Sequence, residues 1–237
     1  MKKKIDTGGT GRFGSILKKY KTKHEIIFPT KNQLDILNIK KARNYLNKLK
    51  PNILIHLAGL SRPMKVHNTN IQKSIDLNII GTANITKVCA EKNIKLIYFS
   101  TNYVYQGSKG NYKESDSLLP VNNYAWSKLG GESSVQLYKN SLILRLSMME
   151  KPFVHKQAFA NVKSSFLYHD EVAKILFKIL NKKGVLNIGG VSRSVYEFAK
   201  KSNSVVKKIY LTKKINAEIP KNSSLNISKL KNILKKK

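Results

Sequence analysis

The sequence predicts an α/β protein, built on a doubly wound parallel sheet with a small, discontinuous C-terminal cap. Short apolar runs alternate with amphipathic stretches through the first 146 residues, and neither an internal repeat nor a low-complexity linker interrupts them. This alternation is typical of an open parallel sheet with helices on both faces. With 237 residues, 41% of them hydrophobic, the chain is long enough to bury a substantial core.

The expected strands of the first part are short apolar runs at residues 4–6, 25–28, 53–57, 95–100 and 142–146. Apolar residues at helical spacing predict helices over residues 13–20, 39–49, 71–89 and 124–138, and residues 106–123 have the composition of a loop. Further on we expect helices at residues 172–180 and 195–200 and a strand at 185–188. The first strand contains Lys4 and Asp6, so we expect it to be frayed or to have a wet edge.

The formal charge of +32 has a compositional explanation. Only five of the 45 basic residues are arginine, the residue favoured for contacts to phosphates and guanine edges. The lysines are spread along the chain with many asparagines and isoleucines, as AT-rich codons would supply. Nucleic-acid binding is therefore the less favoured alternative, while the charge should steer anionic substrates toward the protein.

Composition also indicates a soluble, cytoplasmic protein that does not bind membranes. The single cysteine, Cys89, excludes an intramolecular disulfide, and no apolar run approaches the roughly 20 residues that cross a bilayer. The basic residues 1–4 are followed by polar residues where a signal peptide would be apolar. No group of His, Cys and Asp has metal-ligand spacing, so we expect no metal site.

Residues 7–14, Thr-Gly-Gly-Thr-Gly-Arg-Phe-Gly, predict a dinucleotide-binding loop. Gly8 allows a tight strand-to-helix turn, Gly11 lets the backbone approach a pyrophosphate, and Gly14 lets helix and strand pack closely. The helix that follows would present its N-terminus to the anion. The pattern is weak alone, but here it follows a strand and opens an amphipathic helix.

The end of the second strand favours NADP, or tolerance of both NADP and NAD. NAD-selective sites usually place an acidic residue there, whereas this strand ends in Phe-Pro-Thr-Lys. Thr30, Lys31 or Arg12 could bind a 2′-phosphate. The alternative is that Lys31 is one more solvated lysine.

Tyr124 and Lys128 have the i, i+4 spacing that places two side chains on one helix face. An ammonium one turn away stabilises a phenolate, and so fits the tyrosine for proton transfer at neutral pH. Ser100 and Thr101 stand at the carboxyl end of the fourth strand, where a hydroxyl can hold a substrate carbonyl. We favour Thr101 for that role; the alternative is a hydroxyl that satisfies local backbone.

Together, these features resemble the extended short-chain dehydrogenase/reductase family, from residue 7 to about residue 230. Residues 78–84, Asn-Ile-Ile-Gly-Thr-Ala-Asn, resemble its Asn-x-x-Gly-Thr-x-Asn motif, and residues 56–59 resemble the third-strand segment that lines the cofactor. Within the family the chain is most similar to the dTDP-4-dehydrorhamnose reductases, in residues 34–36, 99–107, 112–116, 142–145 and 197–199.

The resemblance implies an NAD(P)H-dependent reductase of a nucleotide-linked 4-keto-6-deoxysugar, in surface-polysaccharide synthesis. It implies that Thr101, Tyr124 and Lys128 form a catalytic trio, with Tyr124 protonating the nascent alkoxide. Asn102 and Tyr103 stand where related dehydratases carry an Asp-Glu pair, which favours simple reduction. Taking the loop and the resemblance together, the expected dinucleotide contacts are Gly8, Gly11, Arg12, Phe13, Gly14, Thr30, Lys31, Asp35, Ala58, Gly59, Asn78, Tyr124 and Lys128.

We therefore expect a dinucleotide-binding Rossmann domain at residues 1–146 and a reduced substrate-binding cap at residues 147–237. His56 and His169 are expected to be packed scaffold residues. Only 22 residues separate Arg145 from Tyr168, fewer than the family carries where part of its substrate pocket lies. This contraction favours the alternative of a non-catalytic, cofactor-binding regulatory subunit. Another sugar-nucleotide epimerase or reductase of the family, and a homodimer, also stay open.

Overall fold

The computed structural model describes residues 3–212 and 218–235. Its contacts divide the chain into two compact units, and each is described by itself. Unit 1 comprises residues 1–100, 126–144 and 180–185, and unit 2 comprises residues 101–125, 145–179 and 186–237. The chain thus passes repeatedly from one unit to the other, and a division into domains at residue 146 stays a prediction.

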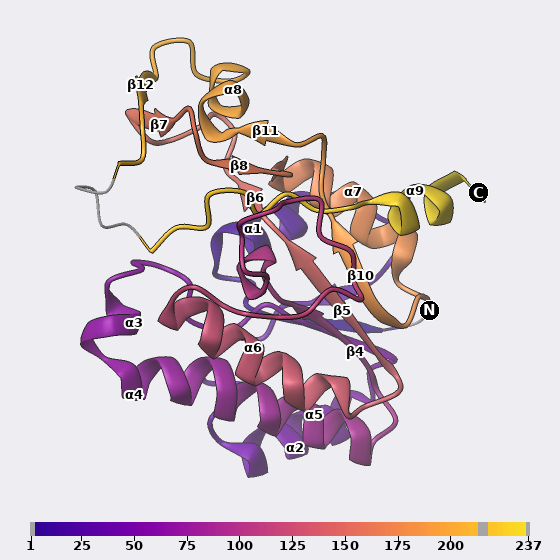
Figure 1. Cartoon of the computed structure of the whole chain (residues 1–237). Helices are drawn as coiled ribbons and strands as arrows, with labels where there is room; N and C mark the ends of the chain where they lie inside the picture. Colours follow the sequence, from indigo (N-terminus) through magenta and orange to yellow (C-terminus); the bar gives the residue numbers. More distant parts are fainter. Residues whose placement is uncertain (1–2, 213–217, 236–237) are drawn as a thin grey trace. The chain divides into compact units, whose positions relative to one another are not determined.

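The central feature is a six-stranded sheet with the strand order β10-β5-β4-β3-β1-β2 (Figure 1). Its strands are β1 (Lys4–Thr7), β2 (Ile26–Ile27), β3 (Ile53–His56), β4 (Lys95–Phe99), β5 (Ser141–Leu146) and β10 (Gly184–Ile188). The pairs β1–β2, β1–β3, β3–β4 and β4–β5 are parallel. The chain adds β2 on one side of β1 and β3 on the other, which confirms the predicted doubly wound α/β fold.

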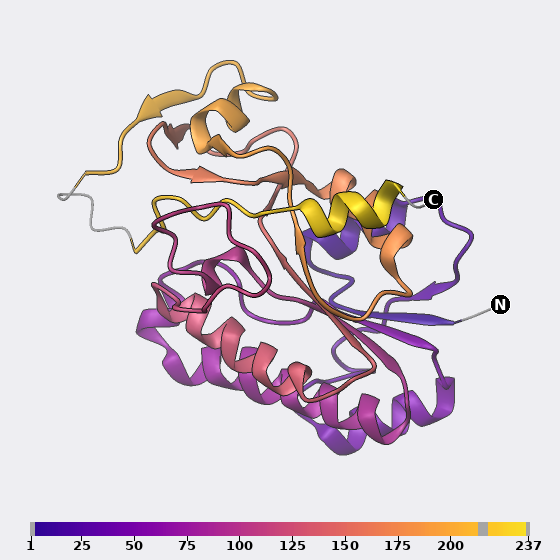
Figure 2. The same cartoon turned by 45° about the vertical axis from the view of Figure 1, so that its right-hand side comes forward.

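Helices cover both faces of the sheet within unit 1. The helical elements in this part of the chain are α1 (Arg12–Lys19), α2 (Ile39–Leu49), α3 (Val66–Thr69), α4 (Ile71–Ser74), the π-helix η1 (Ile75–Ile80), α5 (Gly81–Glu91) and α6 (Asn123–Gln136), whose residues 123–125 are counted with unit 2. Helices α2, α5 and α6 form a layer against one face (Figures 1 and 2), where Leu46, Cys89 and Val135 join a buried cluster with Tyr98 of β4. Phe13 of α1 instead packs on Phe99, whose side chain points to the opposite face, with ring centroids 5.3 Å apart.

Unit 2 contains short elements, of which the sequence predicted few. They are η2 (Asn102–Val104), β6 (Met148–Met149), β7 (Gln157–Phe159), β8 (Lys163–Ser164), β9 (Leu167–Tyr168), α7 (His169–Ile179), β11 (Arg193–Ser194), α8 (Val195–Lys200), β12 (Lys207–Ile209) and α9 (Ser228–Lys235). The predicted helices at 172–180 and 195–200 correspond to α7 and α8. Strands β6 to β12, apart from β10, form three two-stranded sheets. Among the described residues, no helix has the length and apolar character needed to cross a bilayer.

Strand β1 is buried along its whole length, so the expectation of a frayed strand or a wet edge was wrong. It lies between β2 and β3, and Lys4 and Asp6 are 2% and 0% exposed. Neither carboxyl oxygen of Asp6 has a hydrogen-bond partner among the described residues. Burial raises the pKa of Asp6 from 3.8 to about 8, against an opposing effect of Lys18. Asp6 therefore keeps its proton at neutral pH.

This carboxyl group should make the protein less stable as the pH rises. Between pH 3.8, where the group titrates in the unfolded chain, and about pH 8, only the folded state holds the proton. Over this range the free energy of unfolding falls by about 1.4 kcal/mol per pH unit. Above the folded-state pKa this group causes no further fall. We expect Asp6→Val to be more stable than the wild type at pH 8 by roughly 2–5 kcal/mol, with a smaller difference toward pH 4, measured by urea unfolding.

Asp116→Asn is the control for this experiment. Lys109, whose Nζ lies 3.0 Å from Asp116 Oδ2, helps to lower the pKa of Asp116, so this carboxylate contributes stability above pH 3.8 and its loss should not stabilise the protein at pH 8. A stability gain in Asp6→Val that does not change with pH would contradict the assignment.

Candidate functional site

The strand order of the sheet reverses between β1 and β3, and open parallel sheets bind ligands outside the carboxyl ends of their strands at such a point. Thr7 and His56 end these two strands and are paired in register. The Thr7 hydroxyl oxygen lies 2.8 Å from His56 Nδ1. The loops that follow these two strands therefore form the candidate site of unit 1.

The loop after β1 is a glycine turn that leads directly into α1. Gly8 has φ +145°, a conformation that favours glycine, and its carbonyl accepts a hydrogen bond of 2.8 Å from the Gly11 N–H. A Cβ added to Gly14 would overlap this same carbonyl. Gly11 is the N-cap of α1 and offers no side chain there. The predicted glycine turn into a helix is therefore present, and binding of an anion by its backbone and the helix N-terminus stays a prediction.

Other residues predicted to contact the dinucleotide differ in how accessible they are. Arg12 is the exposed first residue of α1, whereas the Phe13 side chain belongs to the core. The Thr30 hydroxyl lies 3.2 Å from Gln33 Oε1 and donates to it. Asp35 is half-buried, and its carboxylate accepts the N–H of Leu37, two residues further on.

The Asn78 side chain holds the loop that follows β3 through hydrogen bonds. Its Oδ1 accepts the Leu60 N–H over 2.7 Å, and its Nδ2 donates to the Leu60 carbonyl and to Ser127 Oγ over 2.9 and 2.8 Å. Gly59 has φ +159°, and a Cβ there would lie 2.7 Å from Asn78 Oδ1. Half-buried Ala58 precedes this glycine. The amide of Asn78 therefore positions the predicted cofactor-lining loop, and direct contact of Asn78 with a cofactor stays a prediction.

His56 is a packed residue, as expected. Its Nε2 lies 3.1 Å from Thr82 Oγ1, and its ring stacks on Tyr98 at a centroid distance of 5.9 Å. Burial, helped by the nearby Lys128, lowers the pKa of His56 to about 3. The imidazole is therefore neutral and links β1, β3 and α5.

Helix α6 carries both Tyr124 and Lys128, one turn apart, as the spacing predicted. Lys128 is buried, and its Nζ lies 4.2 Å from the centroid of the Tyr98 ring. The Tyr98 hydroxyl donates to the Lys128 carbonyl over 3.0 Å. Burial lowers the pKa of Lys128 to about 7, and Glu132 opposes this effect. The side chain can thus exchange between ammonium and neutral amine close to neutral pH.

The two hydroxyl groups after β4 have different partners. Ser100 Oγ donates to Glu132 Oε2 over 2.5 Å. Thr101, the first residue of unit 2, accepts the Tyr103 N–H at its hydroxyl oxygen over 3.2 Å. Because a hydroxyl is also a donor, this contact leaves Thr101 able to donate.

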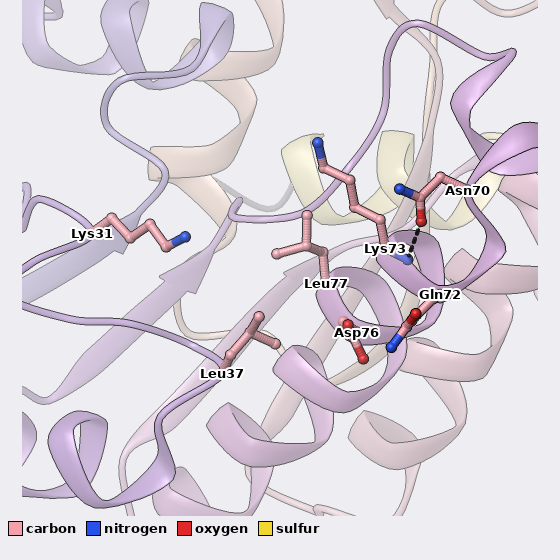
Figure 3. Close-up of a pocket in the computed structure, with 7 residues that line it drawn as sticks. All are labelled: Lys31, Leu37, Asn70, Gln72, Lys73, Asp76 and Leu77. Carbon is pink, nitrogen blue, oxygen red and sulfur yellow. Dashed lines mark hydrogen bonds between the residues drawn. The ribbon is translucent and has the colours of Figure 1, made fainter.

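Unit 1 also contains a cavity of about 300 Å³, which Lys31, Leu37, Asn70, Gln72, Lys73, Asp76 and Leu77 line. Figure 3 shows Lys31 extending toward it from the segment after β2, with Leu37 and Leu77 between Lys31 and the residues of α4. Lys73 lies on α4, whose N-cap Asn70 accepts the Lys73 N–H over 2.9 Å. The lining thus combines two leucines, two lysines and one acidic residue, Asp76.

Sequence reasoning missed Lys73 and Glu132. Lys73 could not be singled out among so many lysines, because only the fold brings α4 to the cavity that also contains Lys31. Glu132 carried a usable signal, since it lies four residues after Lys128 and so on the same helix face.

Three comparisons relate the chain to known proteins. It is 30% identical to methionine adenosyltransferase 2 subunit beta of Xenopus laevis over 153 residues, which are 60% of this chain and 46% of that protein. It is 28% identical to dTDP-4-dehydrorhamnose reductase of Aggregatibacter actinomycetemcomitans over 152 residues, which are 62% of this chain and 51% of that protein. The chain therefore spans about half the length of these two relatives.

Its structure is similar to that of dTDP-4-dehydrorhamnose reductase from Bacillus anthracis, solved in complex with NADP. The TM-score is 0.86 at 25% identity, over 98% of this chain and 92% of that one. The family model described as the RmlD substrate binding domain matches residues 3–162, more than half of the chain. The protein therefore belongs to the RmlD substrate binding domain family, among the extended short-chain dehydrogenase/reductases that its motifs resemble.

Proposed function

We propose that this protein is an NAD(P)H-dependent reductase that converts the C4 ketone of a nucleotide-linked 6-deoxysugar to an alcohol. The observation that carries the proposal is the α6 helix of a chain in this family, where Tyr124 precedes a buried Lys128 by one turn. The Bacillus anthracis structure, a dTDP-4-dehydrorhamnose reductase in complex with NADP, supports both the substrate class and the cofactor.

The residues present fit a dinucleotide. Gly8, Gly11 and Gly14 carry no side chains, and a Cβ on Gly11 would lie 3.1 Å from the Gly8 carbonyl, so the turn can stay tight while its backbone faces a diphosphate. The N-terminus of α1 adds a partial positive charge at the same place. The remaining predicted contacts, from Arg12, Ala58 and Gly59, belong to this proposal. When bound, the reduced nicotinamide supplies the hydride.

Residues of the protein would then supply the proton that the reduction requires. Tyr124 gives its phenolic proton to the oxygen that becomes the alcohol, and the ammonium of Lys128 stabilises the phenolate that remains. The Thr101 hydroxyl is proposed to donate a hydrogen bond to the substrate carbonyl. The hydride and this proton together account for the two hydrogens that the ketone gains.

The first test is the oxidation of NADPH or NADH in the presence of a dTDP-4-keto-6-deoxysugar. The reaction is monitored by the loss of absorbance of the reduced cofactor. We expect turnover by the wild type and a 10²–10⁴-fold lower kcat for Tyr124→Phe, because the general acid is lost. Tyr210→Phe, at a side chain that is 53% exposed, is the control and should keep full activity.

The same assay distinguishes the alternative function. The alternative is a regulatory subunit that binds the cofactor without catalysis, and one relative of the chain, methionine adenosyltransferase 2 subunit beta, is named as a subunit. Cofactor binding without turnover of any candidate sugar nucleotide would support that function and refute the reductase.

The cavity generates a prediction about cofactor preference. We propose that Lys31 and Lys73 contact the 2′-phosphate of NADP, with Asp35 and Thr30 near the adenosine. We expect Lys31→Ala and Lys73→Ala each to weaken NADPH binding roughly fivefold or more, about 1 kcal/mol for an exposed ion pair, and to change NADH binding little. Fluorescence titration of both cofactors measures this, with the exposed Lys40→Ala on α2 as control. Equal weakening of both cofactors would contradict the assignment.

A further inference from the structure

Ser100 and Glu132 form a buried polar pair between β4 and α6 in unit 1. Ser100 Oγ donates to Glu132 Oε2 over 2.5 Å, and the two residues are 6% and 3% exposed. The serine therefore fixes the position of this carboxyl group inside the unit.

Four side chains bear on the charge of Lys128. From the sheet, Lys128 meets the Tyr98 ring, and it is close enough to His56 to affect that imidazole electrostatically. His56 is neutral, because burial and Lys128 lower its pKa to about 3. On α6 itself, Tyr124 lies one turn before Lys128 and Glu132 one turn after it. Glu132 is the only carboxylate among these four groups.

A buried lysine loses its proton more readily than an exposed one, unless a nearby negative charge raises its pKa. Burial lowers the pKa of Lys128 to about 7, and Glu132 is the group that raises it. Removing one partner of a buried charge pair leaves the other charge uncompensated. Without the carboxylate, the neutral amine would predominate at neutral pH.

We propose that Glu132, held by Ser100, is a positioning residue that keeps the ammonium of Lys128 charged. The catalytic meaning of this inference rests on the proposed function, in which the ammonium stabilises the Tyr124 phenolate. Glu132 itself touches no reacting atom and acts through Lys128. Its effect should therefore appear in the protonation of Lys128 even when no substrate is present.

Direct titration of Lys128 tests the proposal without any catalytic assay. In protein labelled with ¹³C at the lysine Cε, the Lys128 resonance is identified by its loss in Lys128→Met, and its midpoint is followed with pH. We expect Glu132→Gln to lower this midpoint by about one pH unit, a tenfold change in the protonation equilibrium. Glu91→Gln, the same change at an exposed residue that is paired with Arg43, should leave the midpoint unchanged.

Two further variants keep the test decisive if Glu132→Gln fails to fold. Glu132→Asp keeps the charge and should hold the midpoint near that of the wild type, whereas Ser100→Ala removes the donor and should lower the midpoint by a smaller amount. An unchanged Lys128 titration midpoint in Glu132→Gln would overturn the proposal. If the Glu132→Gln variant does not fold, an unchanged midpoint in Ser100→Ala would overturn it instead.

The pH profile of kcat supplies a second readout. Lys128 must be charged for activity, so the basic limb of the profile should move to lower pH in Glu132→Gln, with activity regained on acidification. A merely structural role would lower kcat equally at every pH and would overturn the proposal. If the wild type turns over no sugar nucleotide, the reductase proposal fails, while the midpoint of Lys128 still decides the role of Glu132.

Discussion

The burial of one ammonium group, that of Lys128, is the constraint on which the polar interior of unit 1 depends. Moving a cation out of water is costly, so its surroundings must offer compensation. Here the Tyr98 ring lies against the Lys128 ammonium, and the Tyr98 hydroxyl donates to the backbone carbonyl of Lys128. Glu132 follows one helical turn later and raises the pKa of the ammonium. The neutral state of His56 is part of this arrangement, because a second cation there would repel the first.

This arrangement requires α6 to lie very close to its neighbours. A Cβ on Gly131 would overlap the Asn78 carbonyl, and a Cβ on Gly130 would lie 2.8 Å from Ile79 Cδ1. Two successive glycines therefore let the helix approach η1. The bond from Asn78 to Ser127 then joins the same helix to the loop after β3. The lysine and the candidate cofactor loop are thus positioned by one set of contacts.

The sequence predicted the parts of the molecule in which local pattern and tertiary environment agree. The spacing of apolar residues located α2 and the helical stretch 71–91, which the structure divides into α4, η1 and α5, and the glycines at 8, 11 and 14 located the turn into α1. It failed for β1, where Lys4 and Asp6 suggested exposure, because strand order decides burial and no local pattern reveals it. It also failed for the two-residue strands of unit 2, whose pairing partners are distant, such as β8 and β11. At the site, the spacing of Glu132 from Lys128 was a usable signal, but its bond to Ser100 depends on the packing of α6 against the end of β4 and has no local pattern.

Three buried ionisable groups show why Lys128 is the one suited to proton chemistry. Asp6 has no hydrogen-bond partner among the described residues, so it stays neutral and can only lower stability when it ionises. Arg145 donates to the Tyr105 hydroxyl and the Glu114 carbonyl over 2.9 and 3.1 Å, and arginine does not lose its proton in proteins. Arg145 is therefore committed to the interior of unit 2 and is a poor candidate for binding a substrate phosphate. Lys128 alone of the three combines a pKa near neutrality with a tyrosine one turn away, so a change in its charge can alter a reaction as well as stability.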